Sequence, residues 1–263
     1  EIAHTIALLL LPFVRKLISS PTPLHLIEKS TVGTGATLLA RCIAWICTGH
    51  DYTSLPEGRD SEECRKRVTA VLQNAIQFLV IDNLSRQLDS SALASALTST
   101  FWEDRILGKT EHKGVPIRCA WVATGNNPVL SRELARRTIR IRMDAKVEQP
   151  HLRDPKNFKH PELLDWTKQN RSELVWGACT FVKYWVKKGM PRGAKSLGMF
   201  ESWAQVIGGI LEAVGIPGFL GNLIDFYENV NIEEEARKAF VGAWLRKYAE
   251  DAVRTSDLFD IAT

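Results

Sequence analysis

No apolar run in the 263-residue sequence reaches the roughly 20 residues that a membrane-spanning helix needs. The run IALLLLPFV is too short and contains Pro12, and it has neither a basic leader nor a secretory cleavage site. The five cysteines are scattered, without metal-ligand spacing. An odd, dispersed set favours reduced thiols over a disulfide framework or a zinc site. We therefore expect a cytoplasmic protein with no membrane partner.

A strong charge of one sign is also missing. Lysine and arginine number 34 against 30 aspartate and glutamate, which leaves a net charge of +4. That balance is compatible with nucleic acid as a partner but does not indicate one. A hydrophobic content of 45% and a charged content of 24% are ordinary for a globular protein. Because the first residue is Glu1 rather than methionine, we expect a piece of a longer protein.

Apolar segments of strand length alternate with helical patterns up to about Pro150. The expected strands are 24–28, 76–83, 119–128 with its loop, and 138–144, and the expected helices are 37–49, 61–75, 90–105 and 131–137. The segment ILGKTEHKGVPIR at 106–118 can form a hairpin with the polar KTEHKG at its tip. Strands that alternate with helices predict an α/β fold with a mainly parallel sheet covered on both faces.

Beyond Pro150 the pattern changes to long amphipathic helices separated by proline and glycine. These helices are expected at 160–189, 200–215 and 232–253. The segment 146–161 is polar and contains three prolines, which favours a domain boundary there. We predict a helical lead-in over residues 1–20, an α/β core over 21–148 and a helical domain over 149–263.

The stretch STVGTGAT follows the first expected strand and fits most of a phosphate-binding loop. In the pattern G-x-x-x-x-G-K-[ST], Gly35 and Thr37 match, but Ala36 stands at the lysine and Ser30 at the first glycine. A strand, a glycine-rich loop and a helix bring backbone N–H groups and a helix N-terminus against phosphate. Thr37 would then hold Mg²⁺ through its hydroxyl. The alternative is a tight turn, formed by Gly33 and Gly35, that binds nothing.

Polar side chains at later strand ends could complete a nucleotide site. Asp82 ends an apolar strand and could hold the metal through water, or it could be a solvated strand-end acid. Asn126 and Asn127 end the next strand and could orient a water or touch the γ-phosphate, or they could form a turn. Arg136 and Arg137 could reach a neighbouring subunit's nucleotide, or could be a solvated basic patch.

The order of GTGAT, FLVIDN, ATGNNP and LARR resembles the AAA+ ATPase core. More narrowly, it resembles the superfamily 3 helicases and the helicase part of phage and plasmid primase–helicase proteins, whose motifs are similarly compact. The phrases DRILG, TGNNP and GIPGFLGN look like the bacterial and prophage branch. The resemblance covers most of the chain and is strongest from about Pro21 to Asp144. It implies a P-loop core with a pre-sensor β-hairpin, followed by an all-helical C-terminal domain.

The resemblance also implies roles for particular residues, with ATP and Mg²⁺ as cofactors. The nucleotide-binding residues would be Ser30, Thr31, Val32, Gly33, Thr34, Gly35, Ala36, Thr37 and Leu38. Thr37 and Asp82 would hold Mg²⁺. Asn83 stands where many AAA+ proteins keep a glutamate, which leaves the water-activating base unassigned.

Further roles implied by the resemblance fall on the last strand end and on the hairpin. Asn126 is the first choice for the sensor, with Asn127 next, and Arg137, or Arg136, is the candidate arginine finger. The tip KTEHKG resembles the Lys-His tip of papillomavirus replicative helicases. It makes Lys109, His112 and Lys113 candidates for contacting the backbone of single-stranded DNA.

By this resemblance the chain is an ATP-dependent DNA helicase motor of a phage, prophage or plasmid replication protein. It would act on single-stranded or forked DNA as a ring, a hexamer, with a primase–polymerase domain upstream. Ala36 would impair hydrolysis, whether the substitution is natural or engineered, and Lys29 could swing in from the strand end. The alternatives are an AAA+ loader or remodeller that does not unwind, and a pseudo-ATPase scaffold.

Overall fold

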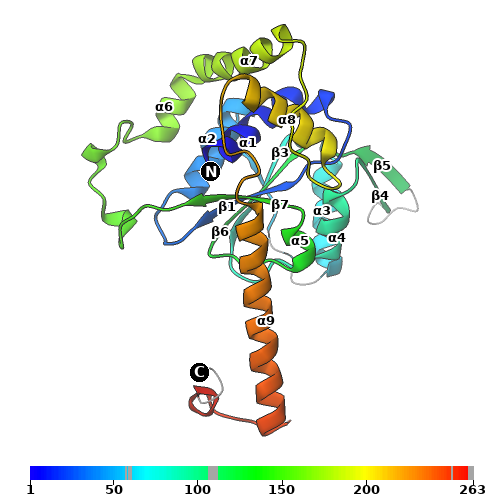
Figure 1. Ribbon diagram of the computed structural model, residues 1–263, viewed down its shortest axis with the longest axis vertical. Coiled ribbons are helices and arrows are strands. Elements are labelled where there is room, and N and C mark those ends of the chain that lie inside the picture. The colour runs from blue at the N-terminus through cyan, green and yellow to red at the C-terminus, as the bar shows by residue number, and fades with distance from the viewer. Residues whose placement is uncertain (57, 59–60, 106–111, 250, 260–263) are drawn as a thin grey trace.

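The computed structural model describes residues 1–56, 58, 61–105, 112–249 and 251–259. A sheet of five parallel strands in the order β2-β3-β6-β1-β7 lies at its centre (Figure 1). The strands are β1 (Leu24–Lys29), β2 (Thr53–Ser54), β3 (Phe78–Leu84), β6 (Ala120–Asn126) and β7 (Thr138–Met143). The predicted parallel sheet is therefore confirmed, and the carboxyl ends of these strands meet at one edge.

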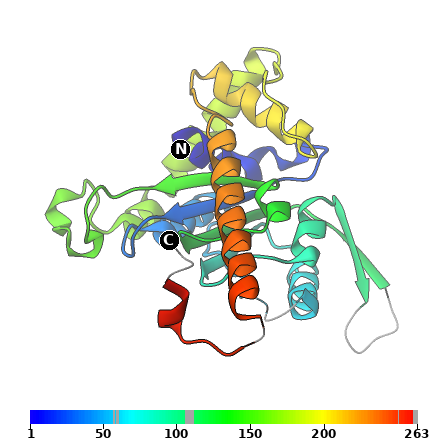
Figure 2. The same cartoon turned by 60° about the horizontal axis from the view of Figure 1, so that its bottom comes forward.

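Helices cover both faces of this sheet, because successive residues of each strand point to opposite sides. One buried cluster joins the sheet to α1 (Ile2–Val14), α2 (Ala36–Thr48), α7 (Arg171–Lys187) and α8 (Glu201–Ala213). A second cluster joins its other face to α3 (Ser61–Leu72), α4 (Ser91–Leu97) and α5 (Arg132–Ala135). Figure 2 shows α8 and α3 on opposite sides of the sheet. The central strands β3 and β6 are buried on both faces, which explains their continuous apolar sequence.

The first helix, α1, is tied into this core through His4. Its Nδ1 lies 2.9 Å from Arg140 O, and Leu220 N donates to its Nε2 at 2.9 Å. Burial lowers the pKa of His4, so the ring is neutral, with Nδ1 as the donor to the carbonyl. Within the described residues, no helix combines the length and the apolar character that crossing a bilayer requires.

The segment expected as one helix over 90–105 is instead a helix followed by a strand. α4 ends at Leu97, and β4 (Phe101–Arg105) pairs antiparallel with β5 (His112–Pro116). The helix ends before Thr98, whose φ of −105° and ψ of 5° leave the helical region. The hydroxyls of Thr98 and Ser99 donate to Ala94 O and Ser95 O, at 3.1 Å and 2.8 Å. The first arm of the two-stranded sheet therefore lies earlier than predicted. Its assignment as the family's pre-sensor hairpin stays a prediction.

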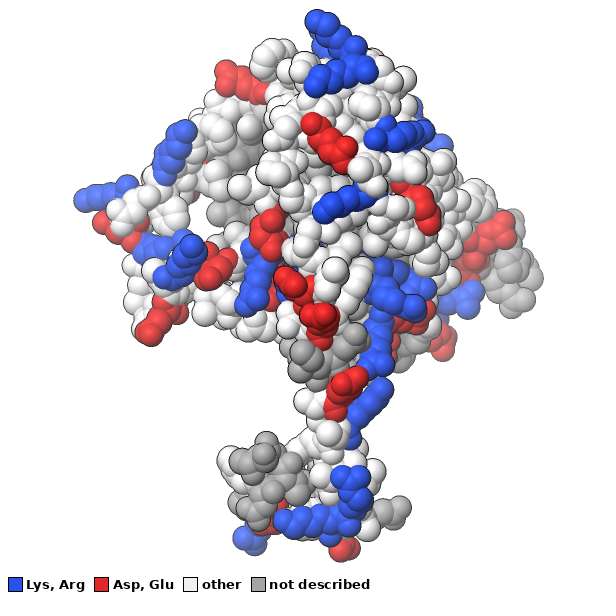
Figure 3. Space-filling model, in the orientation of Figure 1, with Lys and Arg blue, Asp and Glu red and all other residues white. Residues whose placement is uncertain are grey.

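Four α-helices are described beyond residue 150 of the chain. They are α6 (Leu163–Gln169), α7 (Arg171–Lys187), α8 (Glu201–Ala213) and α9 (Leu223–Tyr248). The single helix expected over 160–189 is broken at Asn170, whose side-chain amide donates to Trp166 O at 2.8 Å. α9 begins earlier than expected and projects from the body, with acidic and basic side chains interspersed along it (Figures 1 and 3). The division into domains at residues 20 and 148 stays a prediction.

Candidate functional site

The glycine-rich loop joins the carboxyl end of β1 to the first residue of α2. Gly33 and Gly35 have φ angles of +83° and +105°, a region that side chains disfavour. Thr34 Oγ1 donates to Thr31 O at 2.7 Å and closes the turn. A Cβ on Gly35 would meet no atom within 4 Å, so the backbone angle, rather than space, requires glycine there. The loop therefore leaves the N-terminal amides of α2 available to an anion.

The predicted nucleotide-binding residues divide between this loop and the first turn of α2. Ser30, Thr31, Val32, Gly33, Thr34 and Gly35 form the loop, and Ala36, Thr37 and Leu38 begin the helix. Val32 is exposed at the loop, whereas the Ala36 methyl is only 1% exposed and packs in the cluster beneath α2. The position that a P-loop lysine would occupy thus contributes apolar packing in this chain.

A segment that follows β7 packs against the other side of the loop. A Cβ on Gly33 would lie 2.9 Å from His151 Cβ, in the short 3₁₀ helix Pro150–Leu152. Arg153 Nη2 donates to Gly33 O at 3.5 Å, and its Nε donates to Pro150 O at 2.9 Å. The sequence interpretation missed His151 and Arg153, because the surrounding residues had the composition of a linker.

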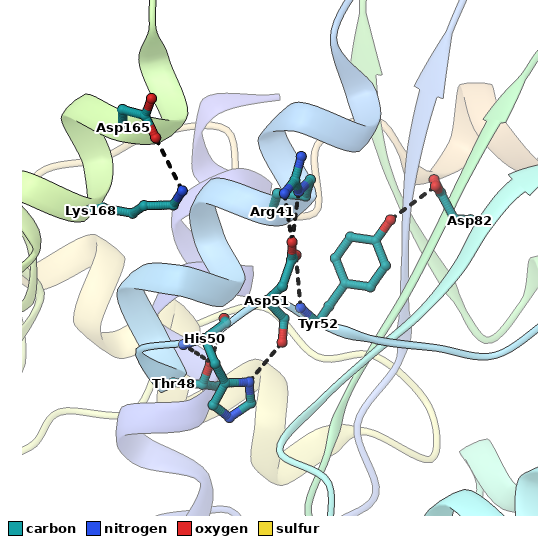
Figure 4. Close-up of polar contacts among 8 residues, drawn as sticks. All are labelled: Arg41, Thr48, His50, Asp51, Tyr52, Asp82, Asp165 and Lys168. Atoms are coloured by element: carbon teal, nitrogen blue, oxygen red, sulfur yellow. Dashed lines mark hydrogen bonds and ion pairs between the residues drawn. The ribbon is translucent and has the colours of Figure 1, made fainter.

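Asp82 is the acidic centre of the site and accepts three hydroxyl hydrogen bonds. Thr37 Oγ1 and Thr124 Oγ1 donate to its Oδ1 at 2.9 Å and 2.6 Å. Figure 4 shows the third bond, in which Tyr52 Oη donates to its Oδ2 at 2.9 Å. Burial acts to raise the pKa of Asp82, but the three hydrogen bonds and the nearby charge of Lys29 lower it by more. The carboxylate is therefore ionised at neutral pH, directly beside the Thr37 hydroxyl.

The strand register explains why these groups meet. Within β3, Phe78 and Val80 belong to the cluster beneath α2, so Asp82, two residues further, points to the same face. Within β6, Val122 belongs to that cluster, and Thr124 follows the same alternation. Since β3 and β6 are parallel neighbours, the two side chains meet at the carboxyl edge of the sheet.

Asn83 and Asn127 both lie just beyond this edge, in backbone conformations that asparagine tolerates better than most residues. Their φ angles are +57° and +41°. Asn83 N donates to Thr124 Oγ1 at 2.8 Å, at an irregularity in the pairing of β3 with β6. Asn127 N donates to Lys29 O at 3.0 Å, and its side-chain amide donates to Ser30 O at 3.3 Å. Asn127 therefore holds the start of the phosphate loop.

Asn126, the first choice for the sensor, faces the same loop start. Its amide satisfies its neighbours when the nitrogen points to the loop, where it donates to Lys29 O and Ser30 O at 3.0 Å each. In the register of the sheet, Asn126 pairs with Lys29. Both asparagines thus lie beside the glycine-rich loop, and their role as sensors stays a prediction.

Tyr52 connects Asp82 to the outer face of α2. Burial raises the pKa of Tyr52, as does its hydrogen bond to Asp82, so the phenol stays protonated and donates. Asp51 Oδ1 accepts from Tyr52 N at 3.0 Å, and Asp51 Oδ2 accepts from Arg41 Nε at 2.8 Å (Figure 4). Tyr52 lies in a polar segment between α2 and α3, and its contact with Asp82 depends on the two-residue strand β2 beside β3.

The two candidate finger arginines lie at the opposite edge of the sheet. Leu24 N, at the start of β1, donates to Arg137 O at 2.9 Å, whereas the phosphate loop follows the far end of that strand. Six strand residues separate the two edges by on the order of 20 Å. Arg137 Nη1 donates to Glu133 O at 2.6 Å, and its side chain is 13% exposed, whereas Arg136 is exposed. Neither arginine can reach this chain's own phosphate loop.

The proposed DNA-contacting residues are described only in part. Lys109 lies outside the described residues, as do the expected arm residues Ile106 and Leu107. His112 and Lys113 belong to β5, where the structure describes their backbone alone. Their contact with DNA stays a prediction.

The donor set at Asp82 suits one kind of cofactor. Among the described residues, no three His, Cys, Asp or Glu side chains gather as they would in a protein-held metal centre. Mg²⁺ commonly takes one or two protein oxygens and completes its shell with waters and phosphate oxygens. The neighbouring Thr37 hydroxyl and Asp82 carboxylate, with the loop amides beside them, therefore fit a magnesium–nucleotide complex.

Comparison with known proteins assigns neither family nor activity. No family model and no curated protein matches the chain. A compound-bound JCV helicase structure is 13% identical over 91% of this chain and 64% of that chain, with a TM-score of 0.37. The apo C-terminal region of NrS-1 is 14% identical over 98% of this chain and 57% of that chain, with a TM-score of 0.41. The chain thus spans less than two thirds of either structure, and a likeness this weak supports no assignment.

Proposed function

We propose that this chain is the ATP-dependent motor domain of a DNA helicase, in a phage, prophage or plasmid replication protein. The observation that carries the proposal is the meeting of the Thr37 hydroxyl and the ionised Asp82 beside a glycine-rich loop at the carboxyl edge of a parallel sheet. Thr37 would bind Mg²⁺ directly, and Asp82 would hold it through water. A magnesium–ATP complex would supply the free energy of hydrolysis.

The groups around Asp82 support this assignment. Thr124 and Tyr52 keep the carboxylate oriented and charged, so its oxygens face the first turn of α2. Asn126, at the neighbouring strand end, is the residue that would orient a water or touch the γ-phosphate. Asn83 N donates to Thr124 Oγ1, and the Asn83 side chain is an amide, which has no basic group to activate water. The water-activating group stays unassigned.

An arginine finger in this chain would have to act on a neighbouring subunit. The strand-length separation between the two sheet edges prevents Arg136 or Arg137 from reaching the phosphate loop of the same chain. Arg136 is the better candidate, because it is exposed while Arg137 is bonded to Glu133. Action in trans requires a neighbouring subunit, and we propose that the subunits form a hexameric ring. Single-stranded or forked DNA would contact Lys109, His112 and Lys113, with salt-dependent and sequence-tolerant affinity.

The second candidate is a pseudo-ATPase scaffold, and the observation that favours it is the buried Ala36 methyl. An AAA+ loader or remodeller that does not unwind would share the nucleotide site but not the DNA activity. The substitution Ala36→Lys distinguishes the helicase motor, the loader or remodeller, and the scaffold. The lysine stem would have to leave a buried position and carry its ammonium to the loop, as long basic side chains do.

The test of the proposal is hydrolysis and unwinding by the Ala36→Lys protein. We expect its ATP turnover to exceed that of the parent by about 10²-fold or more, because positioned cations act strongly on phosphoryl transfer. Asp82→Ala in the same background should remove this turnover. Hydrolysis without unwinding of a forked duplex would indicate a loader or remodeller. Absence of nucleotide binding in both proteins would indicate a scaffold.

A further inference from the structure

Lys29 projects into the candidate nucleotide site from the end of β1. Side chains alternate along a strand, and Ile27 belongs to the buried cluster that contains α2 residues Ala36 and Ala40. Lys29, two residues further, therefore points to the same face, which is also the face of Asp82. This direction is fixed by the sheet register, in which Lys29 pairs with Asn126.

The ammonium group of Lys29 lies among the groups that surround Asp82. Its Nζ donates to Asn83 Oδ1 at 3.5 Å, a long and weak hydrogen bond. Its charge is close enough to contribute to the lowered pKa of Asp82. The backbone is held firmly, because Lys29 O accepts from Asn127 N at 3.0 Å. The backbone of Lys29 is thus fixed, and its four-carbon side chain is flexible. Among the described residues, its ammonium group has only the weak hydrogen bond to Asn83.

Arg153 is the other cation at the loop, and its geometry is less suitable. Its guanidinium is bonded to Pro150 O and Gly33 O and lies over the Phe158 ring, 5.0 Å from the centroid. These contacts hold it on the outer side of the loop, against the segment that follows β7. Lys29 instead extends to the side where Asp82 and Thr37 meet.

We propose that Lys29 is the phosphate-binding cation of this site, in place of the lysine that Ala36 replaces. Its ammonium would contact the terminal phosphates of a nucleoside triphosphate held by the loop amides. The sequence position differs from that of a P-loop lysine, but the ammonium lies near the Asp82 carboxylate, which accepts from the Thr37 hydroxyl. The inference rests on the proposed nucleotide site, and it explains how such a site binds phosphate with a methyl at position 36.

The experiment is equilibrium binding of magnesium–ATP, measured by titration calorimetry with the whole chain. Lys29→Gln keeps the stem length and removes the charge, and Lys16→Gln is the matched control, since Lys16 is an exposed lysine outside the site. We expect Lys29→Gln to weaken binding by about ten- to a hundredfold, the value of a charge-assisted hydrogen bond. Lys16→Gln should bind as the parent does, and Lys29→Arg should recover part of the affinity. Melting temperatures without nucleotide establish that each variant is folded.

The double variant Ala36→Lys/Lys29→Gln separates this inference from the proposed function. If Lys29 fills the role of the missing lysine, the double variant should bind magnesium–ATP at least as tightly as the parent. Equal binding by the parent and by Lys29→Gln, or binding by Ala36→Lys when the parent has none, would overturn the role of Lys29 and leave the nucleotide site standing. Failure of both the parent and Ala36→Lys to bind would overturn the nucleotide site itself.

Discussion

Replacing Thr124 by valine tests the hydroxyl network around Asp82. Thr124 is fully buried, and its hydroxyl both donates to Asp82 Oδ1 at 2.6 Å and accepts from Asn83 N at 2.8 Å. A bond to a charged group contributes about 1.5–3 kcal/mol, and an ordinary one about 1 kcal/mol. Valine fills the same space but removes both bonds, so we expect Thr124→Val to lose about 3 kcal/mol of folding free energy.

The loss should be visible in thermal unfolding and should depend on pH. For a chain of this size, about 3 kcal/mol corresponds to a melting temperature lower by about 6–12 °C. The lowered pKa of Asp82 means that its ionised form stabilises the fold above the unfolded value of about 3.9. That contribution disappears as the pH falls through the folded pKa. The deficit of Thr124→Val should therefore be complete at pH 7 and narrow below about pH 4.

Thr124→Ser is the matched control, since it keeps the hydroxyl and removes only a methyl group. We expect the serine variant to melt several degrees above the valine variant at pH 7, and the difference to narrow in acid to the part that comes from the bond between Asn83 N and Thr124 Oγ1. Equal melting temperatures at pH 7 would refute the network. A difference that stays constant from pH 7 to pH 3 would show that the loss does not come from the bond to the Asp82 carboxylate.

Three further predictions concern other parts of the chain. In the Ala36→Lys background, Arg136→Ala should bind ATP but not hydrolyse it, and mixing this variant with Asp82→Ala subunits should recover some hydrolysis. If co-assembled mixtures recover none, the arginine does not act in trans. Lys113→Ala should weaken single-stranded DNA binding about equally across sequences and reduce the slope of log K against log salt by about 0.7. If the affinity is unchanged at every salt concentration, Lys113 does not contact the DNA. Gly33→Ala should lower the melting temperature more than Gly189→Ala, because both have positive φ but only Gly33 lies against His151; equal losses would contradict the close approach.

The elements that position the site could be predicted because their sequence signals are local. The apolar runs of β3 and β6 identify strands buried on both faces, and the glycines at 33 and 35 mark a loop with unusual backbone angles. Gly49 marks the end of α2 by the same reasoning. By contrast, residues 101–105 were expected to continue a helix. Their strand conformation depends on pairing with β5, which local propensity does not report.

The donors to Asp82 could not be predicted in the same way. Thr124 resembles any threonine in a strand, and its role appears only when the register of β6 against β3 is known. Tyr52 lies in a segment of turn composition, and its contact depends on a two-residue strand at the sheet edge. His151 reaches the loop from a segment with three prolines nearby. Each of these contacts joins residues far apart in the sequence, so the spacing of residues within a motif does not predict them.

The network around Asp82 bears on the choice between a motor and a scaffold. A partly buried carboxylate with three hydroxyl donors is rarely the most stable solution for a sheet edge, because well-packed apolar side chains are often equal or better there. The three hydroxyls stabilise the fold once a carboxylate is present at position 82, but a scaffold would not need a charged side chain there. An ionised, oriented carboxylate beside a hydroxyl is instead what a bound metal ion requires. If Lys29 supplies the phosphate-binding charge, the chain has groups for binding both phosphate and Mg²⁺, and the methyl of Ala36 alone does not make it a scaffold.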